Sequence, residues 1–205
     1  MKKILMAIVT VLFAAPSFAQ YSSGGFSLSE STLYYGLRMG PTFSTLTGDY
    51  VDLGTKVGIN LGAVVGARVS ESTPIFLESG LYYSMRGSKK GKTSVGLNYL
   101  EVPILIKYGV QVADEIAILP YVGPYFAYGI SGKKKIENGD VVQKRGSYNY
   151  FNHWDMGFKI GCGAEYNKLY AELGYQIGVS NLAKDTPEDL KAHTSNIYFN
   201  VGVNF

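Results

Sequence analysis

Nine charged residues share one side of the alternating segments in this chain, and together they form its largest candidate site. Each stands opposite a row of aliphatic residues at a period of two, which is the pattern of a strand with one apolar and one polar face. They are Arg38, Arg68, Glu78, Arg86, Glu101, Lys107, Lys159, Glu165 and Glu172. Because five are basic and four acidic, and buried charges must be paired, we expect a mutually paired interior network. A narrow ion-conducting path along the same charges is the alternative.

A Ser/His/Asp set is the one arrangement that could support catalysis. His153 and Asp155 open one predicted strand and Ser131 closes the strand before it, so the three could meet at one rim and hydrolyse an acyl bond. No nucleophile motif surrounds Ser131, and residues at a rim are usually just solvated. We therefore expect no catalysis.

No metal site is indicated either. Asp49 and Asp52 lack a calcium-loop pattern, and we expect neither a metal nor a cofactor.

Eight further basic residues fall in two breaks between predicted strands: Lys89, Lys90, Lys92, Lys133, Lys134, Lys135, Lys144 and Arg145. In the second break, Asn138-Gly139 is a strong signal for a type I′ hairpin that would lengthen the flanking strands. The basic loops are either solvated or in contact with anionic lipopolysaccharide groups or a partner protein.

The chain divides into three parts. Residues 1–19 have the pattern of a cleaved signal peptide, with Lys2 and Lys3, an apolar stretch at 4–15, and a small-x-small site that ends at Ala19. Residues 20–32 form a Ser/Gly-rich flexible leader, and residues 33–205 form one domain. Since the only cysteine is Cys162, the exported domain is expected to fold without an intramolecular disulfide.

The composition excludes some classes of function. Without Lys2 and Lys3, 17 basic residues face 16 acidic ones, and this balance argues against a nucleic-acid partner. The 25 glycines and 17 tyrosines suit strongly curved strands with aromatic residues at an interface. No segment after residue 20 reads as an apolar helix of spanning length. A membrane would therefore be crossed by strands.

Eight alternating segments organise the domain: residues 33–44, 57–69, 74–87, 96–110, 116–131, 153–166, 169–179 and 195–205. The breaks are alternately long and short, as in outer-membrane barrels, whose strand number is even. A soluble lipocalin-like barrel is the competing architecture. Every strand charge lies opposite the aliphatic face, and a lipid-facing Arg or Lys at mid-bilayer would cost about 2–4 kcal/mol. We predict an all-β fold, an eight-stranded antiparallel closed transmembrane β-barrel, with both termini periplasmic.

Two local features add expectations. Pro103, Pro120 and Pro124 lie inside predicted strands, and because proline lacks an N–H, we expect bulges there. The last segment ends on Phe205, and outer-membrane barrels resemble this ending, which implies an insertion signal read by the barrel-insertion machinery. Deletion of Phe205 should impair assembly and leave any chemistry unchanged.

The stretch Tyr99-Leu100-Glu101-Val102-Pro103-Ile104-Leu105-Ile106-Lys107-Tyr108 resembles a motif of small PorT-like outer-membrane β-barrel proteins. The segments 36–44, 77–83 and 120–125 are similar to other strands of that family, so the resemblance covers about residues 33–205. It implies the barrel fold and an outer-membrane location. Members named after PorT are linked to protein secretion and gliding, but fold does not by itself transfer function.

Together these observations predict a structural or interaction barrel with a polar, plugged interior and basic extracellular loops. A narrow pore or a transport- or secretion-associated barrel is the alternative, and a lipid-modifying enzyme is third. The expected partners are outer-membrane lipids including lipopolysaccharide, the insertion machinery, and an envelope or extracellular protein.

Overall fold

The computed structural model describes residues 33–48, 54–70, 72–91, 93–113, 115–138, 141–149, 151–183 and 191–205. The predicted signal peptide and leader, Asp49, Asp52 and Lys92 lie outside these residues. Among the residues described, no helix has the length and apolarity needed to cross a membrane.

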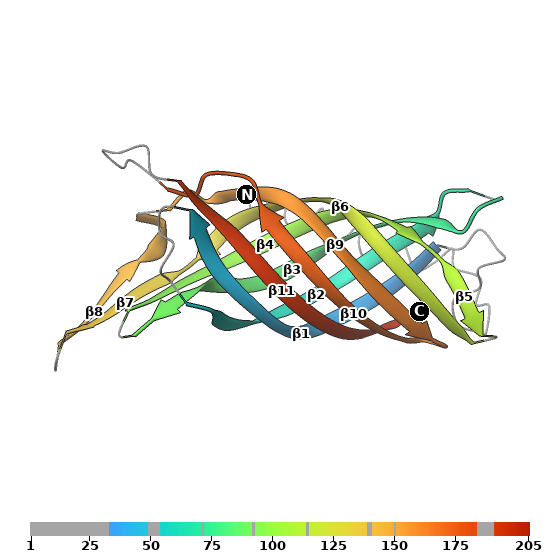
Figure 1. The fold of residues 1–205 in the computed structure, drawn as a ribbon, viewed down its shortest axis with the longest axis horizontal. Helices are drawn as coiled ribbons and strands as arrows, with labels where there is room; N and C mark the ends of the chain where they lie inside the picture. The colour runs from blue at the N-terminus through green and yellow to red at the C-terminus, as the bar shows by residue number, and fades with distance from the viewer. Residues whose placement is uncertain are drawn as a thin grey trace, which may run out of the picture.

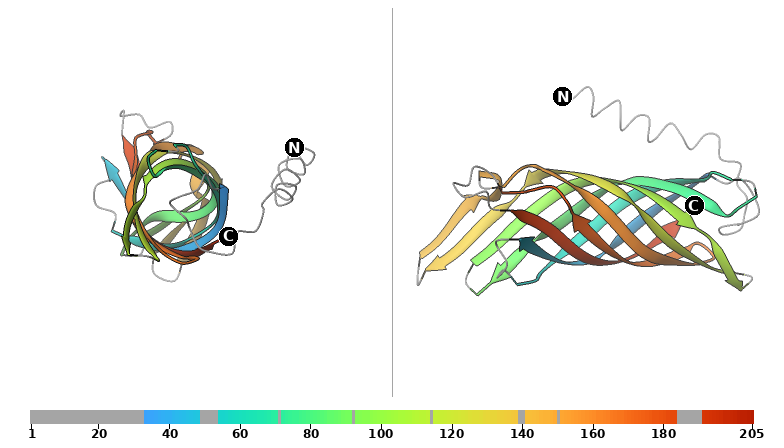
Figure 2. Two further views of the ribbon diagram at one scale, coloured as in Figure 1. Left: turned by 90° about the vertical axis from the view of Figure 1, so that its right-hand side faces the viewer. Right: turned by 45° about the horizontal axis from the view of Figure 1, so that its top comes forward.

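Eight long strands form a closed antiparallel barrel (Figure 1). They are β1 (Leu33–Gly48), β2 (Lys56–Arg68), β3 (Ile75–Lys90), β4 (Thr93–Tyr108), β6 (Ile116–Ser131), β9 (Trp154–Tyr166), β10 (Leu169–Gly178) and β11 (Ala192–Asn204). Neighbours in the chain pair with each other, while β1 pairs with β11 and β4 pairs with β6 across the intervening β5. The view along the barrel shows the resulting ring (Figure 2). The predicted eight-stranded closed barrel is confirmed.

Three short strands extend the barrel at its two ends. The end where β1 begins and β11 finishes is called the termini end, and the opposite one the loop end. At the termini end β5 (Val110–Ala113) pairs with the start of β6 and occupies most of the break predicted between residues 110 and 116. At the loop end β7 (Lys133–Asn138) and β8 (Val141–Gly146) form the predicted hairpin, which projects beyond the wall (Figure 1). A 3₁₀ turn, η2 (Ser147–Asn149), leads from it towards β9.

The connection between β3 and β4 is shorter than the sequence predicted. The sequence predicts a break between the strands at 74–87 and 96–110, but Ser88 pairs with Val95 and Lys89 with Ser94. Gly91 has a φ of 53°, which is a left-handed conformation that glycine adopts without a steric penalty. A tight turn at Gly91 therefore lets both strands continue to the loop end.

Side chains alternate between an apolar exterior and a largely polar interior. On the outside, Leu61, Ile160 and Leu173 are 55%, 57% and 60% exposed. On the inside, Asp155 and Lys159 of β9 are buried. An exposed apolar band that encircles a closed sheet is stable in lipid, where barrels and helices are the only spanning structures with all their backbone groups paired.

The bulges predicted at Pro103, Pro120 and Pro124 are wrong. The β6–β9 register is constant from Ile116 to Tyr128, and the β4–β6 register is constant from Tyr99 to Lys107. A proline removes the N–H on one side of its strand only. Around Pro103 the β3–β4 ladder accordingly omits two pairings and resumes in the same register.

The register shift in this part of the wall lies elsewhere. Between Asn98 and Tyr99 the partner on β6 changes from Ser131 to Gly129, so Ile130 is the extra residue. This bulge is at the loop end, just before the chain leaves the wall for β7. Bulges commonly occur at barrel rims, where they end or redirect a strand.

Inward tyrosines lie against glycines directly opposite them on the neighbouring strand. The pairs are Gly62 with Tyr82, Gly66 with Tyr34, Gly161 with Tyr121, and Gly174 with Tyr198. A Cβ on Gly62 would stand 2.6 Å from Cγ of Tyr82, closer than real Cβ contacts. The glycines thus provide the room that the rings fill, which explains why both residue types are abundant.

Gly62→Val tests this fit. Because the new side chain overlaps the ring of Tyr82, we expect about 1–3 kcal/mol of destabilisation, as for overpacking elsewhere. The measurement is the urea midpoint of unfolding in detergent micelles. The matched control is Ala63→Val, on the exposed face of the same strand. Equal midpoints for the two variants would contradict the account.

Candidate functional site: the barrel interior

A buried cluster of four charges occupies the interior towards the loop end. Arg86 of β3 donates through Nη1 to Oδ2 of Asp155 at 2.9 Å. Arg86 also pairs with Glu101 of β4, and Glu101 pairs in turn with Lys159 of β9. All four side chains are at most 3% exposed. Two cations and two acids therefore alternate across the lumen, which keeps each buried charge next to an opposite one.

Asp155 has the densest set of hydrogen-bond donors in this cluster. Besides Arg86, it accepts from the hydroxyls of Thr194 at 2.8 Å, Ser180 at 2.9 Å and Tyr125 at 3.2 Å. These donors come from β11, from the segment after β10, and from β6. Asp155 thus links three segments of the chain through hydrogen bonds. The sequence placed it at the rim, but it is buried inside the barrel and has a structural role.

A second charge cluster lies towards the termini end. Oε1 of Glu78 is 2.8 Å from Nζ of Lys107, and Oε2 is 3.8 Å from Nη2 of Arg38. The hydroxyl of Tyr34 donates to Oε2 of Glu78 at 2.7 Å, and Nζ of Lys107 donates to the hydroxyl of Tyr170 at 2.9 Å. One carboxylate on β3 therefore holds two cations and a phenol that come from β1 and β4.

The remaining predicted interior charges divide into two kinds. Glu165 and Glu172 are buried and accept from side-chain amides, Glu165 from Asn204 at 2.8 Å and Glu172 from Asn200 at 2.7 Å. Arg68 is only half-buried at the termini end, where its Nε donates to the carbonyl of Ser70 at 2.7 Å. The structure buries eight of the nine predicted residues and leaves Arg68 at the rim.

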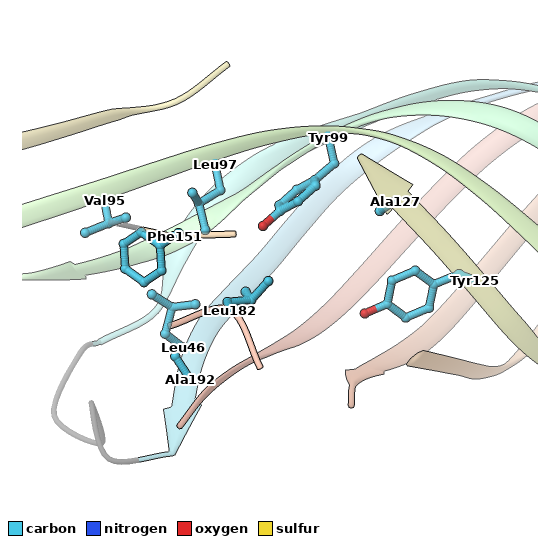
Figure 3. Close-up of a cluster of buried hydrophobic side chains, with 9 residues drawn as sticks. All are labelled: Leu46, Val95, Leu97, Tyr99, Tyr125, Ala127, Phe151, Leu182 and Ala192. Carbon is cyan, nitrogen blue, oxygen red and sulfur yellow. The ribbon is translucent and has the colours of Figure 1, made fainter. Parts of the chain in front are cut away.

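Buried apolar side chains gather towards both ends of the barrel. The loop-end apolar cluster consists of Leu46, Val95, Leu97, Tyr99, Tyr125, Ala127, Phe151, Leu182 and Ala192 (Figure 3). The termini-end apolar cluster consists of Tyr34, Phe76, Leu119 and Tyr170. All of these side chains are buried. The strand registers interleave these side chains with the charges, because Phe76 is opposite Lys107 and Tyr170 is opposite Glu165.

Two residues of the loop-end apolar cluster come from outside the wall strands. Phe151 follows η2, and Leu182 follows β10. Backbone bonds hold both segments in place: Asn152 N–H donates to Leu182 O, and Leu182 N–H donates to Ala192 O, each at 2.8 Å. These connections thus fold into the mouth of the barrel (Figure 3).

Buried tyrosines also line the interior, and the sequence did not predict them as interior residues. The ring centre of Tyr198 is 4.7 Å from Nζ of Lys159, and that of Tyr170 is 3.9 Å from Cζ of Arg38. Cations over aromatic faces gain electrostatic attraction. Alternation could have predicted this inward position, because Tyr170 stands two residues before Glu172 and so lies on the same face of the strand.

The predicted Ser/His/Asp set does not form a proton relay. Nδ1 of His153 lies 2.7 Å from the carbonyl of Gly129, and Oγ of Ser131 accepts from Nδ2 of Asn98 at 2.9 Å. Asp155 is engaged by Arg86 as described above. Each member is therefore bonded elsewhere, while catalysis needs the base next to the nucleophile.

The imidazole of His153 instead stacks on Tyr148 of η2, with ring centres 4.4 Å apart. The hydroxyl of Tyr148 donates to the carbonyl of Asn98 at 3.0 Å. Burial raises the pKa of this hydroxyl above its usual value, so the phenol remains a donor. At this part of the loop end, ring stacking and a hydrogen bond hold η2 against the barrel wall.

The other predicted site residues lie at the two ends. Lys89 and Lys133 are exposed at the loop end, Lys90 ends β3, and Lys134, Lys135, Lys144 and Arg145 lie in the β7–β8 hairpin. Phe205 is exposed, and its backbone pairs with that of Tyr35 at 2.7 and 3.3 Å. Its role in insertion stays a prediction. Within the described ranges, no group of three or more His, Cys, Asp or Glu side chains could hold a metal ion.

A closed antiparallel barrel with an apolar exterior and a charged, buried interior is a transmembrane β-barrel. The chain belongs to the outer membrane protein beta-barrel domain family, whose model matches residues 18–184. This membership places the protein in the outer membrane. A search of curated proteins found no match.

Solved outer-membrane protein structures are similar to this chain at low sequence identity. A major outer membrane protein from Thermus thermophilus is 12% identical with a TM-score of 0.51, covering 85% of this chain and 100% of that chain. Neisserial surface protein A (NspA) is 14% identical with a TM-score of 0.49, covering 83% and 97%. Ail, the attachment invasion locus protein of Yersinia pestis, is 14% identical with a TM-score of 0.46, covering 84% and 98%. The likeness to the Thermus protein shows a shared fold and nothing further.

Arg86→Met tests the dependence of the fold on the interior charges. Removing the cation leaves Asp155 buried without it, and breaking a buried pair costs about 3–5 kcal/mol. Urea unfolding in micelles should show this loss, and Arg86→Met/Glu101→Gln/Asp155→Asn should recover part of it. Lys89→Met, on the exposed rim of the same strand, is the control. A midpoint for Arg86→Met that matches this control would contradict the account.

Proposed function

We propose that this protein is a structural or docking barrel of the outer membrane, with a lumen closed to solutes and no catalytic role. The observation that carries the proposal is the interior filled with buried side chains. Buried charges are paired along the lumen, and apolar clusters pack among them towards each end. An eight-stranded barrel is just wide enough for its side chains to fill the interior, so we expect the described side chains to leave no continuous polar path.

The proposed orientation places the termini end in the periplasm and the loop end outside the cell. Outer-membrane barrels have short periplasmic turns and longer extracellular loops. Here the two longest connections, between β6 and β9 and between β10 and β11, are both at the loop end. Residues 1–19 support export, since they have the pattern of a cleaved signal peptide in a Gram-negative cell.

Membership of the PorT-like group within the family is also a proposal. It rests on residues 99–108, which supply the inward-facing Glu101 and Lys107 of the two charge clusters. A role associated with secretion is the alternative that this resemblance supports. The proposed partners remain outer-membrane lipids including lipopolysaccharide, the insertion machinery, and an envelope or extracellular protein.

Conductance separates a closed barrel from a narrow pore, the runner-up. In planar bilayers we expect the wild-type protein to give no steady unit current, because the packed interior excludes hydrated ions. The variant Tyr121→Ala/Tyr198→Ala removes two inward rings whose hydroxyls are 3.0 Å apart, and it should conduct. Steady unit currents from the wild-type protein would overturn the closed reading.

The matched control for that variant is Tyr128→Ala/Tyr175→Ala, which removes two rings from the exposed face. It should remain silent. Each protein is first checked for faster migration of the unheated form on a detergent gel, so that silence is not mistaken for failed folding.

A further inference from the structure

One inward row of the wall brings together three polar side chains from four neighbouring strands. Gly40 of β1 pairs with Asn60 of β2, and on its other side a Cβ on Gly40 would stand 2.8 Å from Cα of Asn200 on β11. Asn200 pairs in turn with Glu172 of β10. Asn60, Asn200 and Glu172 are 1%, 1% and 5% exposed. We call these three side chains the amide–carboxylate row.

The two amides of this row have side-chain oxygens without a donor. Oδ1 of Asn60 and Oδ1 of Asn200 are buried and accept no hydrogen bond from any residue that the structure describes. Nδ2 of Asn200 donates to Oε1 of Glu172 at 2.7 Å, so its Oδ1 is turned away from that carboxylate. Gly40 places no side chain between the two amides. Because a buried acceptor without a donor loses its hydration and gains nothing in return, a positive group between these oxygens would be stabilising.

The carboxylate of the row has only neutral donors. Besides the amide, Glu172 accepts from the hydroxyl of Tyr170 at 3.1 Å. The two cations of the termini-end cluster, Arg38 and Lys107, both pair with Glu78. Among the residues that the structure describes, Glu172 forms no ion pair of its own. A buried carboxylate needs a close counter-charge to offset its desolvation, and the row supplies none.

The donor set of the row is that of a hard cation. Carbonyl and carboxylate oxygens are the ligands that such ions prefer, and carbonyl oxygens can replace the hydration shell of an alkali cation. Inward side chains converge as the wall of a narrow barrel curves, so the three groups approach one part of the lumen. One positive charge matches the single carboxylate, whereas a divalent ion would leave a charge uncompensated in a buried position.

We propose that Asn60, Asn200 and Glu172 hold a monovalent alkali cation, Na⁺ or K⁺, inside the barrel. The ion accepts electron density from Oδ1 of each amide and neutralises the carboxylate. It links β2 with β10 and β11 across Gly40, and so stabilises the wall on both sides of β1. The inference goes beyond the closed-barrel proposal and does not depend on it.

The test measures how the urea unfolding constant in detergent micelles depends on the cation. NaCl or KCl replaces choline chloride at constant ionic strength. A cation that binds only the folded barrel lowers the unfolding constant about tenfold for each tenfold rise in its concentration above Kd. We expect this dependence in the wild-type protein with NaCl or KCl. Added EDTA should leave it unchanged, because EDTA removes divalent ions only.

Asn200→Leu and Asn196→Leu are the matched pair for this test. Both replace an inward asparagine of β11 that is 1% exposed, but only Asn200 belongs to the amide–carboxylate row. Asn200→Leu should lose the cation dependence and Asn196→Leu should keep it, whatever each substitution does to the absolute midpoint. Asn60→Leu, on a different strand, should lose the dependence as well.

Each contrary result overturns a stated part of the proposal. A wild-type unfolding constant that is the same in choline, Na⁺ and K⁺ would overturn it, as would follow if buried water or a protonated Glu172 satisfied the row. Equal dependence in Asn200→Leu and Asn196→Leu would overturn this site. A dependence abolished by EDTA would overturn the monovalent assignment. Planar-bilayer conductance is measured separately, so failure here is distinct from failure of the closed-barrel proposal.

Discussion

Closure of the sheet is the constraint on which the rest of this structure depends. In lipid, an unpaired strand edge leaves backbone N–H and C=O groups without partners, so the first and last strands must meet. The β1–β11 ladder achieves this from Gly36 opposite Asn204 to Gly48 opposite Ala192. The backbone of Phe205 adds a further pair with Tyr35. With only eight strands, closure also makes the lumen narrow, and the interior must therefore be filled by side chains.

The interior meets this demand in two ways. Glycines stand opposite tyrosines, so that large rings fit inside the barrel. Charges are placed so that each cation meets a carboxylate, as Arg86 meets Glu101 and Asp155. An isolated charge in this space would be costly, because desolvation is repaid only by close, well-oriented partners. Apolar clusters towards both ends pack among these charges.

Much of this could be predicted from sequence because a strand has a period of two. Alternation located the eight strands and the burial of residues such as Arg38 and Lys107. It also predicted that Asp155 points inward, because Asp155 is an even number of residues from Lys159 and lies on the same face of the strand. The spacing of Asp155 from His153 nevertheless suggested a catalytic set.

Pairing partners could not be predicted from alternation. Arg86 and Asp155 are 69 residues apart, and their meeting depends on the register of every strand between them. Phe151 and Leu182 fold inward from segments with no period at all, and the prolines interrupt ladders without shifting them.

The central claim is that side chains fill the lumen, and thiol accessibility measures this most directly. In a Cys162→Ser background, Asn60→Cys introduces a thiol at an inward position that is 1% exposed, and Thr47→Cys introduces one at the exposed loop end. A membrane-impermeant maleimide should label Thr47→Cys in folded protein and should label Asn60→Cys only after unfolding in urea. Labelling of both thiols at similar rates in the folded barrel would contradict the account.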